Sequence, residues 1–91
     1  MEEDRVALLG LVVENPDSVE PLNQLLHQYK DYIIGRMGLP YRQRGVSIIS
    51  IVLDAPGNII SSLSGKAGML SGVTAKAVYS KMPERRDESA D

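Results

Sequence analysis

The sequence predicts an α+β domain in which four strands and two helices follow one another in the order β-α-β-β-α-β. Three observations predict it. Four runs rich in β-branched and aliphatic residues are separated by turn signatures. Two segments between these runs carry apolar residues at helical spacing. The second and third runs are joined directly by a short polar turn, which indicates a hairpin. This is the ferredoxin-like sandwich, a four-stranded antiparallel sheet with two helices on one face.

The first half of the chain supplies one strand and one helix. Residues 5–14 form the first strand and end at the turn signature Asn15-Pro16-Asp17. Ser18 is suited to cap the following helix, which we expect to end near Lys30. The apolar positions of this helix are Val19, Leu22, Leu25, Leu26 and Tyr29. His27 falls on its polar side, where we expect a surface residue rather than a metal ligand.

The second half begins with a hairpin. Residues 32–39 form the second strand, in which Gly35 and Gly38 indicate a bulge or a close backbone approach. Residues 40–45 form the turn and residues 46–54 the third strand. Asn58 is the expected cap of the second helix, and the fourth strand covers residues 73–80. The apolar face of the second helix consists of Ile59, Ile60, Leu63, Ala67 and Leu70.

The two strands expected at the centre of the sheet are apolar on both sides. Right-handed crossovers place residues 5–14 and 46–54 there. A monomer with helices on one face should carry polar side chains on the other face, yet both alternating sets are largely apolar in each strand. The pattern therefore predicts a homo-oligomer, a dimer or tetramer, formed through the open sheet face or by edge pairing. The residues assigned to this interface are Leu9, Leu11, Val13, Ile49, Ile51 and Leu53.

Composition excludes several functions. The chain has 91 residues, a net charge of −2, one His and no Cys. The lack of Cys excludes thiol chemistry, thiolate zinc sites and iron–sulfur ligation. No Ser has a candidate His and acid partner, so we expect no enzyme activity, and we expect no metal and no cofactor.

The same composition fits one domain over residues 1–81 and a disordered tail over residues 82–91, where Pro83 precedes a run of charges. The acidic N-terminus lacks the positive region of a secretory signal, and the apolar run 6–13 is too short to span a bilayer. We therefore expect a cytoplasmic protein without a membrane partner.

Three arginines near the predicted hairpin are candidates for anion or nucleic-acid contact. Arg36, Arg42 and Arg44 carry guanidinium groups, which suit carboxylates and phosphates. The alternative is a solvated hairpin tip kept soluble by its charge. The sequence has no DNA-reading helix and no RNA-binding aromatic pattern, so direct DNA binding is not expected.

Three stretches carry a resemblance to a known family. Residues 25–40, the run VSIISIVLDA and the run LSGKAGMLSGVTAKAV resemble the iron-only hydrogenase system regulators, and the likeness extends over about residues 6–78. The resemblance implies an ACT-like fold related to the C-terminal half of nickel-responsive repressors, an oligomer and a regulatory role. The nickel site of those repressors does not carry over, because this chain has one His and no Cys. We also expect no counterpart of their DNA-binding ribbon-helix-helix, since the first strand starts near Arg5.

The resemblance also implies a ligand position. ACT-type domains bind small ligands near the loop between the first strand and first helix, which here contains Asn15, Asp17 and Ser18. Backbone N–H groups at a helix start can hold a carboxylate, although an ordinary capped turn also explains these residues. The expected function is a regulatory oligomer that binds a small effector or a regulatory protein and acts indirectly on transcription or hydrogenase maturation. The alternative is a structural interaction module without a ligand.

Overall fold

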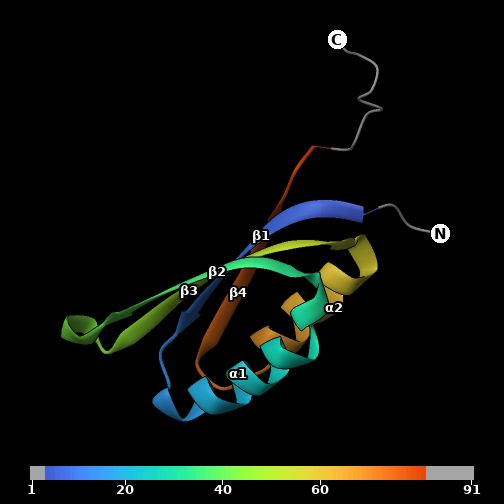
Figure 1. Cartoon of the computed structure of the whole chain (residues 1–91). Helices are drawn as coiled ribbons and strands as arrows, with labels where there is room; N and C mark the ends of the chain where they lie inside the picture. Colours follow the sequence, from blue (N-terminus) through green and yellow to red (C-terminus); the bar gives the residue numbers. More distant parts are fainter. Residues whose placement is uncertain (1–3, 82–91) are drawn as a thin grey trace.

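The computed structural model describes residues 4–81 and confirms the predicted order of strands and helices (Figure 1). The elements are β1 (Asp4–Val13), α1 (Val19–Gln28), β2 (Ile33–Tyr41), β3 (Val46–Pro56), α2 (Gly57–Gly68) and β4 (Val73–Tyr79). Short 3-10 turns join them: η1 (Pro16–Ser18), η2 (Lys30–Tyr32) and η3 (Arg42–Arg44). The tail expected to be disordered, residues 82–91, lies outside the described residues.

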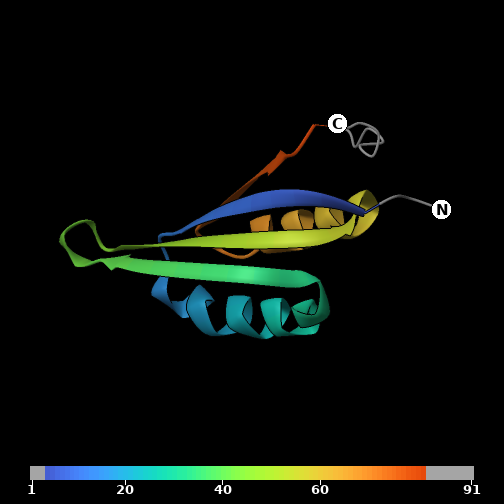
Figure 2. The ribbon, with the colours of Figure 1, turned by 45° about the horizontal axis from the view of Figure 1, so that its top comes forward.

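The four strands form one antiparallel sheet in the order β2-β3-β1-β4. The prediction that the first and third strands are central is confirmed. Both helices lie on the same side of the sheet, which gives two layers and the ferredoxin-like fold. The β2–β3 hairpin projects beyond the other elements (Figures 1 and 2) and accounts for the long dimension of the molecule, 47 Å against 25 and 17 Å.

The core forms where alternate side chains of the central strands meet the helices. β1 contributes Ala7, Leu9, Leu11 and Val13, and β3 contributes Ile49, Ile51, Leu53 and Ala55. They pack with residues of the two helices, namely Leu22, Leu26, Ile60, Leu63 and Ala67. Each of these side chains is less than 9% exposed, so removing them from water supplies the main driving force for folding.

This core corrects the interface assigned from the sequence. Leu9, Leu11, Ile51 and Leu53 are 0% exposed, and Val13 and Ile49 are 2% and 7% exposed. These residues pack under the helices of their own chain, so no second copy can reach them. The reason for the error is that both alternating sets are apolar, and the strand pattern alone does not say which set the helices cover.

Of the two predicted helix caps, one is at the expected position. Ser18 is the N-cap residue of α1, but its hydroxyl donates to the carbonyl oxygen of Ser71 at 2.6 Å and makes no capping bond to the helix. The capping side chain is Asn15, whose Oδ1 accepts from the backbone N–H of Asp17 at the start of η1. At the second helix the N-cap is Pro56, not Asn58.

A polar contact joins the two helices across the surface of the core. The hydroxyl groups of Tyr29 and Ser62 share a hydrogen bond of 3.2 Å, and the Lys66 Nζ lies 5.6 Å from the centre of the Tyr29 ring. The hydrogen bond to Ser62 lowers the pKa of Tyr29 below its ordinary value; burial opposes this effect and Lys66 adds to it. The contact links the C-terminal end of α1 to α2.

The burial of the helix-facing set predicts a large cost for truncating it. We expect Leu9→Ala to lower the free energy of unfolding by about 3 kcal/mol, because it leaves a cavity among fully buried side chains. Met69→Ala removes a side chain that is 85% exposed and should change stability by less than about 0.5 kcal/mol. Urea unfolding of both variants at one protein concentration makes the comparison. Equal losses for the two variants would contradict the assignment of the core.

Candidate functional site

The face of the sheet that the helices leave uncovered is apolar. We call it the open face and define it by the side chains that the strand register places opposite the core: Val6, Leu8, Val12, Met37, Leu39, Tyr41, Ile48, Val52 and Val78. Their exposed fractions reach 68% at Met37, and apart from the half-buried Val52 none is below 37%. The apolar surface extends over β2, β3 and β1 and reaches β4 at Val78, whereas Thr74 and Lys76 make the rest of β4 polar on this face.

The register orders the open face in rows across the strands. Leu8 lies between Val52 and Val78. Two positions along β1, the central row is small only in its middle, where Gly10 lies beside Ser50; Met37 and Lys76 stand at its two ends. The next row is again apolar on three strands: Leu39, Ile48 and Val12. Two apolar rows therefore flank a row with a low centre.

The open face is large enough to matter. All four strands pair along residues 7–13 of β1. Strands lie about 4.8 Å apart and rise about 3.4 Å per residue, which gives a face of about 19 by 24 Å, or roughly 450 Å² in projection. The largest apolar patch on a typical monomer covers about 300–600 Å² and is often functional, so a face of this size is a candidate interaction surface.

The predicted ligand residues of the β1–α1 turn lie close together and bond to the chain itself. The Asn15 Nδ2 donates to the Ser71 Oγ at 3.0 Å, beside the bond from the Ser18 hydroxyl to the Ser71 carbonyl. The backbone N–H groups of Asp17 and Ser18 donate to the side chain and the carbonyl of Asn15. These bonds anchor the turn to the α2–β4 connection, which fits the ordinary capped turn. A ligand contact at Asn15, Asp17 or Ser18 stays a prediction.

Gly72 completes this anchor because it allows the two connections to touch. Its φ of +70° is in the left-handed region, and a Cβ at this position would lie 2.7 Å from the Asn15 Cβ. The Gly72 carbonyl accepts from the Glu14 N–H at 2.7 Å. A glycine is therefore required both by the backbone angle and by the close approach of the neighbouring turn.

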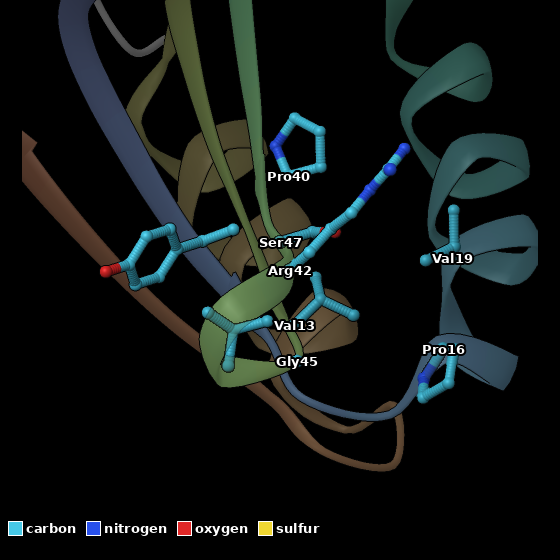
Figure 3. A pocket seen from close by; sticks show the side chains of 9 residues that line it. Val13, Pro16, Val19, Pro40, Arg42, Gly45 and Ser47 are labelled. Carbon is cyan, nitrogen blue, oxygen red and sulfur yellow. The ribbon is translucent and has the colours of Figure 1, made fainter.

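A hollow of about 250 Å³ lies between this turn and the hairpin tip, and we call it the hairpin hollow (Figure 3). The Arg42 side chain extends from η3 toward α1 (Figure 3). The other lining residues are mainly apolar: Val13, Pro16, Val19, Pro40, Tyr41, Gly45, Val46 and Ser47. One guanidinium among apolar walls suits a small carboxylate with an apolar body.

Arg36 does not join Arg42 and Arg44, although the sequence groups the three. Arg42 and Arg44 lie in η3 at the hairpin tip. Arg36 lies further back on β2 and donates from its Nη2 to the Asn23 Oδ1 of α1 at 2.6 Å. It lines a second hollow of about 260 Å³, the α1-edge hollow, with Asn23, Leu26, His27, Lys30 and Ile33. Sequence reasoning missed His27 and Lys30 as its neighbours, and the signal was their i, i+3 spacing, which continues one stripe of α1 into η2.

Within residues 4–81, no group of three or more His, Cys, Asp or Glu side chains is placed to hold a metal ion. None of the helices described for this part of the chain is both long and apolar enough to cross a membrane.

Fold and surface together define a ferredoxin-like domain whose sheet has one covered and one uncovered apolar face. Residues 5–77 match the family model "TM1266-like: Iron-only hydrogenase system regulator, putative", so the chain belongs to this family. The structure of the uncharacterized protein TM1266 from Thermotoga maritima is similar, with a TM-score of 0.83 and 38% sequence identity over 87% of this chain and 100% of that chain. A search of curated proteins gives no match.

The close contact at Gly72 predicts that replacing it costs more stability than replacing Gly45, the other glycine with a left-handed φ. Gly45 has a φ of +68° with open space around its missing Cβ, so Gly45→Ala should cost about 1 kcal/mol from the backbone alone. Gly72→Ala adds a clash with Asn15 and should cost about 3 kcal/mol. Thermal or urea unfolding measures both. Similar losses in the two variants would show that the turn moves aside without cost.

Proposed function

We propose that this chain is a regulatory domain that self-associates through its open face and binds a small effector or a regulatory protein. It acts on its target system through that binding rather than through a DNA-reading element of its own. The observation that carries the proposal is the open face: a complete core is already buried on the other side of the sheet, and a second apolar surface remains exposed.

A second copy is the occupant that best fits this surface. Two sheets that stack face to face lie about 10 Å apart and interdigitate their side chains, which requires matching apolar rows. The open face supplies two such rows around a low centre, and a two-fold interface brings a surface against itself. The projected face of roughly 450 Å² is little more than half of the about 800 Å² of accessible surface that each partner buries in a standard interface, so an interface of that size would also include the hairpin beyond the face.

The edges of the sheet fit a second copy less well. The free edges are β2 and β4. On β2, Pro40 has no N–H to donate to an added strand. The strand β4 is the shortest of the sheet, Val73–Tyr79. Face packing is therefore favoured over edge pairing.

The effector part of the proposal rests on the hairpin hollow. It adjoins the β1–α1 turn, where the resemblance to ACT-type domains implies a ligand, and it holds a cationic side chain, Arg42, that the turn itself lacks. No hydrogen bond or ion pair within residues 4–81 engages the Arg42 guanidinium. A small carboxylate with an apolar body would pair with Arg42 and cover the apolar wall of Val13 and Val19.

Self-association is tested by placing a charge on the open face. We expect the unaltered chain to form a dimer or tetramer in native mass spectrometry and light scattering, and Leu8→Asp to shift it to a monomer, because an aspartate there would be buried against apolar side chains. Met69→Asp is the matched control, since Met69 is exposed away from the open face, and it should leave the oligomer intact. Circular dichroism checks that both variants fold.

Two results would count against this interface. A monomeric unaltered chain overturns self-association. An oligomer that persists in Leu8→Asp and in a second open-face variant, Val12→Asp, assigns the contact to a sheet edge instead.

Effector binding is tested with Arg42 and its neighbour. We expect a member of a panel of small carboxylates to raise the melting temperature of the protein; a ligand at 100 times its Kd adds about 2.7 kcal/mol of stability. Arg42→Gln should abolish the shift. Arg44→Gln removes a charge from the same tip but not from the hollow, and should retain it. An oligomer without any ligand response supports the structural interaction module.

A further inference from the structure

The α1-edge hollow is built by two elements that meet at the edge of the sheet. Along α1 and the residues after it, Asn23, Leu26, His27 and Lys30 form one stripe at helical spacing. This stripe faces β2, and Figure 2 shows α1 running alongside that strand. From β2 the hollow receives Ile33 and Arg36. Leu26 is 1% exposed and, with Ile33, provides an apolar floor beneath polar walls.

An irregularity in β2 directs Arg36 into this hollow. Residues three apart on a regular strand point to opposite faces. Here the register shifts between Ile33 and Gly35, so that Ile33 pairs with Leu53 and Arg36 with Ile51, both of which face the helices. The bulge therefore places Ile33 and Arg36 on the same side of the sheet. Bulges commonly re-aim a side chain in this way beside functional sites.

The hollow gathers positive charge without a carboxylate in its lining. Its ionisable side chains are Arg36, Lys30 and His27. The neighbouring acid is Asp31, whose Oδ1 lies 3.7 Å from the Lys30 Nζ; both side chains are largely exposed, which makes the pair weak. No carboxylate of residues 4–81 pairs with Arg36.

Arg36 is instead held in position by a neutral group. Its Nη2 donates to the Asn23 Oδ1 at 2.6 Å, which fixes the guanidinium against α1 without neutralising it. A guanidinium carries five N–H donors in a planar fork, so others remain for a ligand. A positioned, uncompensated arginine beside a lysine is the arrangement by which proteins recognise phosphate oxygens.

We propose that the α1-edge hollow binds a small phosphomonoester. Arg36 pairs with two phosphate oxygens, Lys30 supplies the second cation, His27 donates a hydrogen bond, and the organic part of the ligand lies on the half-buried Ile33. A volume of about 260 Å³ accommodates a phosphate with a short carbon chain. The dianionic charge of a phosphomonoester matches two permanent cations better than a monocarboxylate does.

The proposed site is independent of the proposed oligomer interface. Arg36 points to the helix side of β2, whereas its neighbour Met37 lies on the open face. A second copy on the open face leaves the α1-edge hollow accessible. The hairpin hollow is separate as well, because the two hollows share no lining residue.

Calorimetric titration with glycerol 3-phosphate tests the site. We expect saturable binding that weakens at least ten-fold in Arg36→Gln and, separately, in Lys30→Gln. The matched controls are Arg44→Gln and Lys76→Gln, which remove one positive charge each outside both hollows and should leave the affinity within two-fold. Both Arg36 and Lys30 are exposed, so these variants are expected to fold, and circular dichroism verifies it. Amide shifts of Asn23, His27 and Arg36 in NMR spectra locate the bound ligand.

Two further ligands decide the chemical class. Inorganic phosphate binding more weakly than glycerol 3-phosphate supports a phosphomonoester, whereas phosphate binding equally well overturns the role of the apolar floor. Succinate binding as tightly as glycerol 3-phosphate overturns recognition of phosphate. The proposal fails entirely if glycerol 3-phosphate does not bind, or if all four variants weaken it alike through net charge. Neither result bears on the oligomer, which is measured without ligand.

Discussion

The structure depends on one constraint: the central strands β1 and β3 are apolar on both faces, and the two helices of residues 4–81 cover only one of these faces. The two helices bury Leu9, Leu11, Ile51 and Leu53 completely. The opposite set, which includes Leu8 and Ile48, is left in contact with water at 44% and 39% exposure. Every additional apolar side chain on that face raises the free energy of the isolated domain relative to an associated one. The apolar side chains of these strands therefore favour association through the open face as well as folding of the core.

The polar side chains, in contrast, mostly bond within the chain, at places where two connections or two helices meet. Asn15, Ser18 and Ser71 join the turn after β1 to the turn before β4. Tyr29 and Ser62 join the two helices. Arg5 stacks 4.5 Å over the Tyr79 ring and donates to the Ser80 carbonyl, which fastens the far end of β4 to β1. The arginines that take no part in these contacts have guanidinium N–H donors available for other molecules.

The fold could be predicted from the sequence because the residues that end its strands and form its turns act locally. Asn15-Pro16-Asp17 ends the first strand, and the polar turn around Gly45, with its left-handed φ, closes the hairpin. What could not be predicted depends on contacts far apart in the chain. The hydroxyl of Ser18 donates to a carbonyl 53 positions away in the sequence. Which alternating set of strand residues is buried depends on which face of the sheet the helices pack against. The sequence grouped Arg36 with Arg42 and Arg44, whereas the structure places it beside α1, because a bulge in β2 changes which face of the sheet it occupies.

The position of β1 has a consequence for how the domain could signal. Val12 and Val13 are consecutive residues at the end of this strand, yet Val12 is on the open face and Val13 lines the hairpin hollow. A molecule in the hairpin hollow that shifts this end of the strand would also shift the side chains that the strand presents on the open face. Effector affinity and subunit affinity would then be thermodynamically linked, each changing the other by the same factor. A single peptide bond, between two adjacent valines, thus connects the hairpin hollow to the open face.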